Sequence, residues 1–193
     1  MQQILNTWKQ YGYISPQKLY FVLQCKYPLS EITKIIHQQE AYQLHKQILK
    51  NPKKEGHITS NNPLRERQMD ILDFQKFSTR NKNYRYILII IDVFTRQLMA
   101  YPLKTKGEKD VSSSLSTMLR QTEKIPWKIQ SDNGKEFLNK SVNAIFKRNN
   151  IFHDVSLKGD HRSLGIIDRI SKTIKTMLYR HFTNNNTMFL MIW

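Results

Sequence analysis

Hydrophobic and polar positions follow two different periods along the chain. Residues 1–46 carry apolar side chains at helical spacing, and the pair Ser15-Pro16 is typical of a helix start. Residues 47–66 are polar and rich in Lys, Asn and Pro, which predicts a linker. From residue 67, apolar runs of strand length alternate with helical patterns. A small helical region followed by a larger mixed domain is therefore expected.

The larger domain, predicted over residues 67–183, begins with hairpin-like strands. The run "YRYILIIID" at 84–92 is continuously apolar, as expected for a strand covered on both faces. Other strands are predicted at 68–77, 97–103, 127–132 and 151–155, and helices at 111–119, 138–146 and from 166 into the 180s. This succession predicts an α/β fold, a mixed sheet flanked by helices. Residues 184–193 are predicted to be a truncated tail.

The charge balance points to a polyanionic partner. The chain has 31 Lys and Arg against 15 Asp and Glu, which gives a net charge of +16. Nucleic acid is the commonest partner of such a protein. A solvated basic surface without a catalytic role is the alternative. Two short helices within residues 1–46 are compatible with a helix-turn-helix, a pattern that many small helical packings share.

The single cysteine limits the sites that the chain can form. Cys25 excludes an internal disulfide and any zinc site that needs two thiolates, and we expect it to be buried. The start "MQQILNTWKQ" lacks the apolar core of a secretory signal, and "MFLMIW" at the end is too short to span a bilayer. These observations predict an intracellular protein without a membrane partner.

Three aspartates are candidate site residues. Asp70 lies within a predicted strand, and Asp132 follows another strand at its carboxyl end, where open α/β sheets bind their ligands. On the last helix, Asp168, Lys172 and Lys175 fall on one stripe. Three carboxylates from two strands and a helix can bind two Mg²⁺ or Mn²⁺ ions. The alternative for the helix is an ordinary exposed face with an Asp–Lys pair.

The wording around these acids resembles a known family. The segments "QMD", "SDNGKEF" and "SLGIIDRISKTIK" resemble the catalytic core of retroviral-type integrases, which have the RNase H-like fold. Thirty-five residues lie between Asp132 and Asp168, as in that family between its last two acids. The segment "YILIIIDVFTRQLMAYPLKTK" further resembles integrases of Maverick/Polinton-like elements, virophages and large DNA viruses. The resemblance covers about residues 65–182.

The resemblance implies a DNA integrase or transposase-type polynucleotidyl transferase. It assigns the three aspartates to catalysis and to two Mg²⁺ or Mn²⁺ ions, and Lys172, Lys175, Asn133 and Lys135 to DNA binding. The expected reactions are 3′-end processing and strand transfer of a viral or mobile-element DNA. The expected partners are element ends, target DNA and further copies of the chain in an active homo-oligomer. The host nucleus is the expected location of an active enzyme, with packaging in a virion as a further option.

Three departures from the family keep alternatives open. The third acid is Asp168 instead of Glu, which shortens its reach by about 1.5 Å. The paired His and Cys zinc module of retroviral integrases is missing, and the chain stops at "HFTNNNTMFLMIW". A natural short form and a truncated or frameshifted gene both fit this ending. The alternatives are therefore a catalytically inactive DNA-binding remnant and an RNase H-like nuclease that cuts without joining.

Overall fold

The structure, a computed structural model, describes residues 1–46, 60–156 and 163–185. Residues 47–59, which are most of the predicted linker at 47–66, and residues 186–193, which are most of the predicted tail at 184–193, lie outside these ranges. The chain divides into two compact units, and helix α7 (Gly165–Asn185) contributes to both. One unit contains the sheet and α7 as far as Ser171, and the other contains the N-terminal helices and α7 from Lys172 onward.

A five-stranded mixed sheet forms the centre of the first unit. Its strand order is β3-β2-β1-β4-β5. The three strands β1, β2 and β3 pair antiparallel, whereas β4 lies parallel to β1 and β5 lies parallel to β4. The strands are β1 (Glu66–Asp73), β2 (Tyr86–Asp92), β3 (Leu98–Leu103), β4 (Lys128–Ser131) and β5 (Phe152–Val155). The α/β prediction with a mixed sheet is confirmed.

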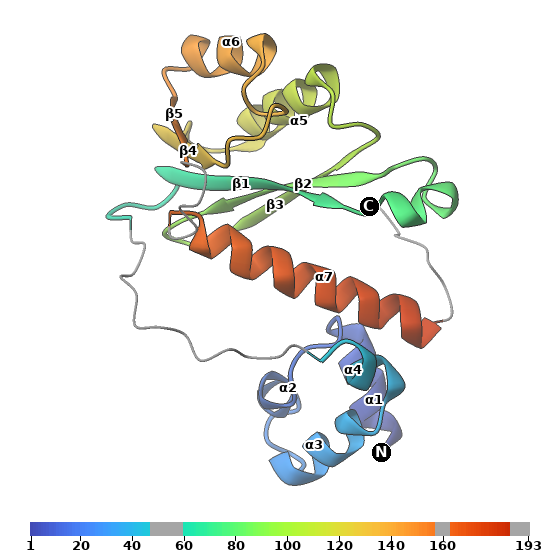
Figure 1. The fold of residues 1–193 in the computed structure, drawn as a ribbon. Helices are drawn as coiled ribbons and strands as arrows, with labels where there is room; N and C mark the ends of the chain where they lie inside the picture. Colours follow the sequence, from blue (N-terminus) through green and yellow to red (C-terminus); the bar gives the residue numbers. More distant parts are fainter. Residues whose placement is uncertain (47–59, 157–162, 186–193) are drawn as a thin grey trace. The chain divides into compact units, whose positions relative to one another are not determined.

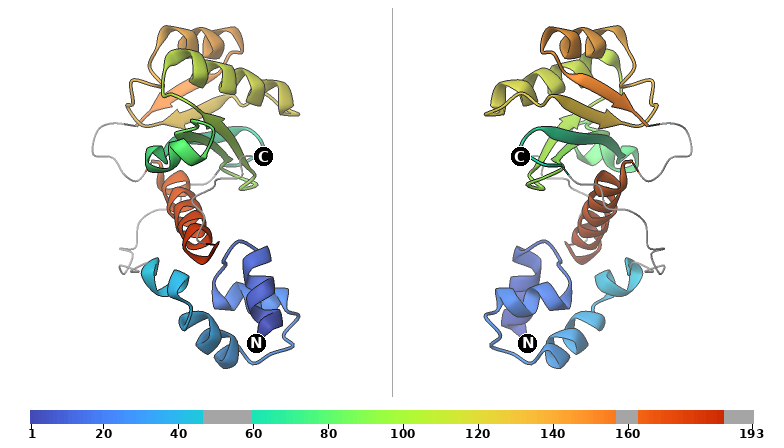
Figure 2. Two further views of the ribbon diagram at one scale, coloured as in Figure 1. Left: turned by 90° about the vertical axis from the view of Figure 1, so that its right-hand side faces the viewer. Right: turned by 90° about the vertical axis from the view of Figure 1, so that its left-hand side faces the viewer.

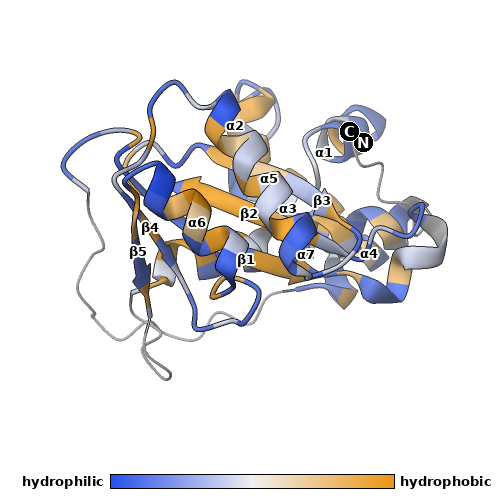
Figure 3. Ribbon diagram, turned by 90° about the horizontal axis from the view of Figure 1, so that it is seen from above, coloured by the Kyte–Doolittle hydropathy of each residue, from blue (hydrophilic) through white to orange (hydrophobic). Residues whose placement is uncertain are grey.

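Helices cover both faces of this sheet. Helices α5 (Glu108–Gln121) and α6 (Lys140–Arg148) lie on one face, and the beginning of α7 lies on the other (Figures 1 and 2). Strand β2 is mostly apolar (Figure 3), and its residues from Leu88 to Asp92 are all buried. Coverage on both faces explains why its sequence is a continuous apolar run and does not alternate.

Alternation along β1 assigns its side chains to the two faces. Met69 and Ile71 join the core beneath α5 and α6. The other face carries Gln68 and Asp70, which hydrogen-bond to residues of the segment that leads into α7 and of α7 itself. The core on the α5–α6 side consists of Met69, Ile71, Leu88, Ile90, Leu103, Val111, Leu115, Met118, Ile129, Phe137, Val142, Phe146 and Ile151.

The first strand ends earlier than its sequence predicts. A 3₁₀ helix, η1 (Gln75–Arg80), replaces the predicted continuation to residue 77. The carboxylate of Asp73 accepts hydrogen bonds from the backbone N–H and the side-chain amide of Gln75, both at 2.9 Å. Such a local side-chain contact offers the backbone an alternative to the sheet ladder, and the strand stops there.

The second unit has a core of its own. Its N-terminal helices are α1 (Gln2–Gln10), α2 (Pro16–Val22), α3 (Leu29–His37) and α4 (Glu40–Leu44). Ser15 caps α2, as predicted, by accepting a hydrogen bond from the backbone N–H of Lys18. The buried core is Ile4, Trp8, Tyr13, Leu19, Leu23, Ile32, Ile35, Ile36 and Ala41. Whether α2 and α3 act as a helix-turn-helix stays a prediction.

The carboxyl-terminal half of α7 belongs to this helical unit. Arg180 donates a hydrogen bond to the carbonyl of Tyr13 at 3.0 Å, and its guanidinium lies 4.6 Å from the ring centroid of Tyr42. His45 hydrogen-bonds to the hydroxyl of Thr183 at 2.8 Å. These polar contacts explain why Arg180, a cation, is buried.

One expectation about a buried side chain is wrong. Cys25 is exposed, because it lies in the turn after α2, where Gln24 and Cys25 adopt positive φ values of 51° and 57°. On α7 the isoleucines at 166, 170 and 174 are only partly buried. Ile167 and Ser171 are the buried residues of its first two turns, and the hydroxyl of Ser171 donates to Asp70 on the sheet. Among the described residues, no helix is long and apolar enough to cross a membrane.

Candidate active site

Asp70 lies in the middle of β1, on the sheet face opposite α5 and α6. Its Oδ1 accepts a hydrogen bond from the backbone N–H of Ile71 at 2.7 Å. Its Oδ2 accepts one from the hydroxyl of Ser171 on α7 at 2.9 Å. The carboxylate is therefore held at both oxygens, and one of its contacts joins β1 to α7.

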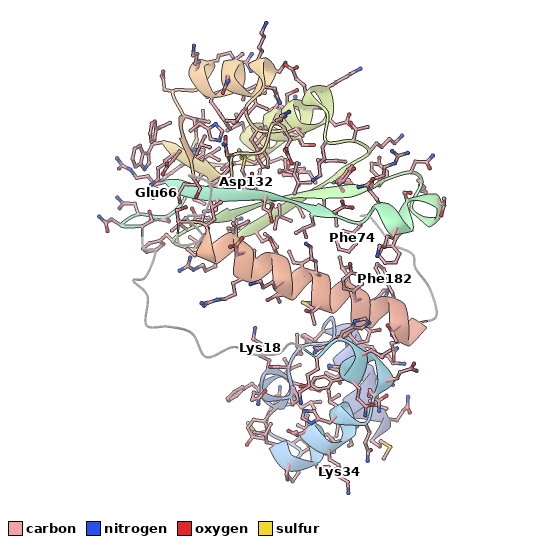
Figure 4. The ribbon with its side chains drawn as sticks, viewed as in Figure 1. Lys18, Lys34, Glu66, Phe74, Asp132 and Phe182 are labelled. Atoms are coloured by element: carbon pink, nitrogen blue, oxygen red, sulfur yellow. The ribbon has the colours of Figure 1, made fainter. Side chains whose placement is uncertain are left out.

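Asp132 follows directly after β4, the strand that runs parallel to β1. Its Oδ1 accepts a hydrogen bond from the backbone N–H of Gly134 at 3.1 Å, which closes the turn that begins here. Figure 4 shows Asp132 next to β1, between Glu66 at the start of that strand and Phe74 just after its end. The register of β1 and β4 thus brings this acid beside the strand that carries Asp70.

The two carboxylates interact electrostatically. Partial loss of hydration raises the pKa of Asp132, although the residue as a whole is exposed. The hydrogen bond from Gly134 lowers this pKa, the negative charges of Asp70 and Glu136 raise it, and Lys106 lowers it. Like charges that disfavour each other's ionised form are typical of carboxylates that share a site.

A buried glutamine links both acids to the start of α7. Gln68 lies two residues before Asp70 and is fully buried. Its amide nitrogen donates to the side chain of Gln130 at 3.1 Å and to the carbonyl of Ser163 at 2.7 Å. Its Oε1 accepts the backbone N–H of Ile167 at 3.0 Å. The amide therefore fixes the first turn of α7, which carries Asp168, against β1 and β4.

Asp168 lies on this first turn and is half-buried. It stands three residues before Ser171, the residue that donates to Asp70. However, within residues 1–46, 60–156 and 163–185 there is no group of three His, Cys, Asp or Glu side chains that could hold a metal ion. The structure thus brings Asp70 and Asp132 together and places Asp168 on the adjoining helix, without forming a three-carboxylate cluster.

The predicted DNA-binding residues lie on two segments. Lys172 and Lys175 follow Asp168 by one and two turns of α7; Lys172 is exposed and Lys175 is half-buried. Asn133 and Lys135 are exposed in the turn after Asp132. Their roles stay predictions.

Glu136 and Lys106 act electrostatically on Asp132 but were not singled out in the sequence. A Cβ atom added at Gly134 would lie 2.7 Å from Oε2 of Glu136 and 3.0 Å from Oδ1 of Asp132, so both carboxylates face the same point. Nζ of Lys106, from the loop before α5, lies 3.6 Å from Oε1 of Glu136. No sequence motif marks the contact, because 29 residues of chain lie between the two partners.

The donor chemistry fits a divalent cation in part. Carboxylate oxygens are the ligands that Mg²⁺ and Mn²⁺ prefer, and the mutual repulsion of Asp70 and Asp132 would be relieved by a cation between them. The third carboxylate is not part of the group. The shorter side chain of Asp168, compared with Glu, offers a physical reason.

Comparisons with known proteins agree with this fold. Residues 60–161 match the family described as the integrase core domain. A transposon-derived protein of Caenorhabditis elegans, F54H12.3, is 29% identical over 110 residues, which cover 56% of this chain and 37% of that protein. The Gag-Pol polyprotein of avian reticuloendotheliosis virus is 27% identical over 104 residues, or 54% of this chain and 9% of the polyprotein. The chain thus spans only a minor part of these relatives.

A solved structure shares the fold. It is the simian T-cell lymphotropic virus intasome in complex with the PP2A regulatory subunit B56 gamma, determined by cryo-electron microscopy. The TM-score is 0.59 at 24% sequence identity, over 89% of this chain and 63% of that one. The family match over residues 60–161 contains Asp70, Asp132 and all five strands. Because the family match extends over more than half of its residues, the chain belongs to the integrase core domain family, with the catalytic-core fold of retroviral-type integrases.

Proposed function

We propose that the chain is the catalytic core of a DNA integrase or transposase that processes 3′ ends and transfers strands. The observation that carries the proposal is the electrostatic proximity of Asp70, on β1, to Asp132, which follows the neighbouring parallel strand β4. Helix α7, which carries Asp168, is hydrogen-bonded to Asp70 through Ser171. Family membership supplies the class of reaction, and the net charge of +16 suits a DNA substrate.

The proposed chemistry consists of two phosphoryl transfers. In the first, a water oxygen bonds to a phosphorus near the DNA end, the bond from phosphorus to the 3′ oxygen breaks, and that oxygen leaves as a hydroxyl. In the second, this hydroxyl attacks a target phosphorus and releases the target's own 3′ oxygen, so the number of phosphodiester bonds is conserved. Neither step needs an oxidant or a reductant.

In this proposal the residues of the chain hold cations and position phosphates. Asp70, Asp132 and Asp168 would hold two Mg²⁺ or Mn²⁺ ions, which when bound supply Lewis acidity to the attacking and leaving oxygens. Lys172, Lys175, Asn133 and Lys135 would contact DNA. The joining of two ends requires at least two copies, so the active form would be a homo-oligomer, acting where host DNA lies, in the nucleus.

A joining assay tests the proposal. Duplex oligonucleotides that end in the terminal sequence of the DNA element encoding the chain are incubated with protein, target plasmid and Mg²⁺ or Mn²⁺. The wild-type chain should join them, and Asp132→Asn should abolish joining while DNA retention on a filter stays within about twofold. Joining by Asp132→Asn at the wild-type rate would refute the assignment. Cut products without joined products would favour a nuclease.

One observation favours a second candidate, an inactive DNA-binding remnant. Asp168 does not complete a three-carboxylate group in the described part of the chain. A remnant would still bind DNA through its charge, with steep salt dependence. Calorimetric titration with Mn²⁺ separates the two candidates, because a remnant would show no metal uptake that depends on Asp70 and Asp132.

A further inference from the structure

The loop between β3 and α5 fixes a lysine beside the carboxylates. The carboxylate Oδ2 of Asp110 accepts the backbone N–H of Thr105 at 2.8 Å and its hydroxyl at 2.9 Å. The same hydroxyl accepts the backbone N–H of Gly107 at 3.1 Å. The backbone on both sides of Lys106 is thus held by side-chain hydrogen bonds, which limits the region that its side chain can reach.

The start of α5, just beyond this loop, is also attached to α6. Oε1 of Glu108 accepts the backbone N–H of Ser141 at 2.7 Å. Hydrogen bonds from the side chain and then the backbone of Ser141 lower the pKa of Glu108. Because α6 follows the segment that carries Asp132 and Glu136, this contact ties the lysine loop to that segment. The distance between Lys106 and the acids is therefore determined by packed elements and not by a free loop.

The ammonium group of Lys106 lies near Glu136 but keeps hydrogen-bond donors that are available to another anion. Its Nζ lies 5.2 Å from the ring centroid of Tyr86 and 3.6 Å from Oε1 of Glu136, which is longer than a hydrogen bond. The exposed fraction of the Lys106 side chain is 40%. An ammonium group has three donors, so it can accept a second anion while it remains beside Glu136.

The charges around Lys106 suggest what that anion is. Asp70, Asp132 and Glu136 place three negative charges close together, and Lys106 is the cation that acts on the pKa of Asp132. A phosphodiester that approaches three carboxylates is repelled unless cations accompany it. A fixed ammonium at the rim supplies one such charge independently of bound metal.

We propose that Lys106 binds a phosphate of the DNA substrate next to Asp132 and Glu136, and that Glu136 and Tyr86 hold its ammonium in place. This inference rests on the proposed function for the identity of the substrate, and it adds a DNA-binding residue to the same site. Lys106 acts directly on the phosphate, whereas Glu136 is a positioning residue that acts through Lys106.

Lys104 offers a matched control. It lies two residues earlier in the same loop, and its Nζ stands over the ring of Tyr84 at 5.5 Å, much as that of Lys106 stands over Tyr86. Within the described residues, Lys104 forms no ion pair with Glu136 and is not among the charges that shift the pKa of Asp132. A general loss of positive charge therefore affects Lys104→Ala and Lys106→Ala alike, and a specific contact affects only the second.

The test measures whether the effect of replacing Lys106 on DNA affinity depends on one particular phosphate. Fluorescein-labelled 25-base-pair duplexes with the element's terminal sequence, each with one neutral methylphosphonate near the end, are titrated with protein in EDTA, so that no strand is cut. Lys106→Ala should weaken binding of the all-phosphate duplex about fivefold and lower the slope of log affinity against log salt by about 0.9. One methylphosphonate position should weaken wild-type binding equally and have no further effect on Lys106→Ala.

Two variants sharpen the result. Lys106→Arg should recover most of the affinity, because it keeps the charge. Glu136→Gln should preserve the coupling but shift or broaden the methylphosphonate position at which it occurs, because Lys106 loses its anchor. Additive losses at every methylphosphonate position, or equal losses in Lys104→Ala, would overturn the inference and leave Lys106 as a counter-ion of Asp132.

The measurement also separates this inference from the proposed function. If the wild-type chain joins no DNA but the coupling is present, the proposed function fails and the phosphate contact stands. If joining depends on Asp132 but no coupling is found, the function stands and Lys106 is not a phosphate ligand.

Discussion

The side-chain Oε1 of Gln68 accepts the backbone N–H of Ile167 at 3.0 Å, which joins strand β1 to the first turn of α7. One amide thereby connects the strand that carries Asp70 to the helix that carries Asp168. Gln130 extends the connection to β4, since its amide accepts from Gln68 and donates to Asp154 at 2.8 Å. The geometry of the site thus depends on buried amides behind the carboxylates.

Replacement of Gln68 by Met should destabilise the fold, although the two side chains have similar volumes. The variant keeps the side-chain volume but leaves the carbonyl of Ser163 and the N–H of Ile167 without their partner. We expect the free energy of unfolding in urea to fall by about 2 kcal/mol and the amide of Ile167 to exchange faster with solvent. Gln97→Met, at an exposed position, is the control and should change neither quantity. Unchanged exchange at Ile167 would contradict the proposed connection.

Asp132→Asn should make the fold slightly more stable at neutral pH. The folded-state pKa of Asp132 is raised, so its ionisation is less favourable in the folded chain than in the unfolded one. Protonated Asp132 contributes full stability below the unfolded pKa, and this contribution is lost as the pH rises through the folded pKa. The amide keeps the Oδ1 acceptor for Gly134 and carries no charge.

Thermal unfolding at several pH values measures this effect. The melting temperature of Asp132→Asn should exceed that of wild type by about 1–2 °C at pH 7. The difference should shrink as the pH falls below the folded pKa, where wild-type Asp132 is itself neutral. A variant that is less stable than wild type at pH 7 would show that the carboxylate is held favourably and not strained.

Asp168→Glu should strengthen metal binding. The longer side chain extends the reach of the third carboxylate by about 1.5 Å. We expect Mn²⁺ affinity to rise on the order of tenfold in a calorimetric titration, because each added carboxylate ligand increases the charge that binds the ion. Asp73→Glu, which lengthens an acid on the other face of β1, is the control. Equal Mn²⁺ affinities for wild type and Asp168→Glu would mean that side-chain length is not the reason why the third acid stays outside the group of Asp70 and Asp132.

Gly134→Ala should disturb the site but not the fold. The three atoms nearest to the new Cβ would belong to two flexible side chains, the closest at 2.7 Å in Glu136 and 3.0 Å in Asp132. The unfolding free energy should change by less than about 0.5 kcal/mol, whereas joining should fall at least about tenfold. The double variant with Glu136→Ala removes one clash and should recover part of the joining activity. Full activity of Gly134→Ala would contradict the close approach of the two acids.

The sequence by itself determined the elements of the sheet unit and the family. Runs of apolar residues at strand and helix spacing predicted all five strands and the helices α5, α6 and α7, because burial of one face or of both faces leaves a local period in the chain. The acids Asp70 and Asp132 were identifiable because the first lies on a predicted strand and the second at the carboxyl end of another, where proteins of this fold class bind ligands.

Only the tertiary structure decided which side chains meet. The contact between Lys106 and Glu136, the bond from Ser171 to Asp70 and the role of Gln68 join residues far apart in sequence, and no local period records such contacts. The exposure of Cys25 likewise depends on the backbone of one turn. Whether Asp168 reaches the other two acids is a matter of ångströms between a helix and a sheet, which packing sets and residue spacing does not.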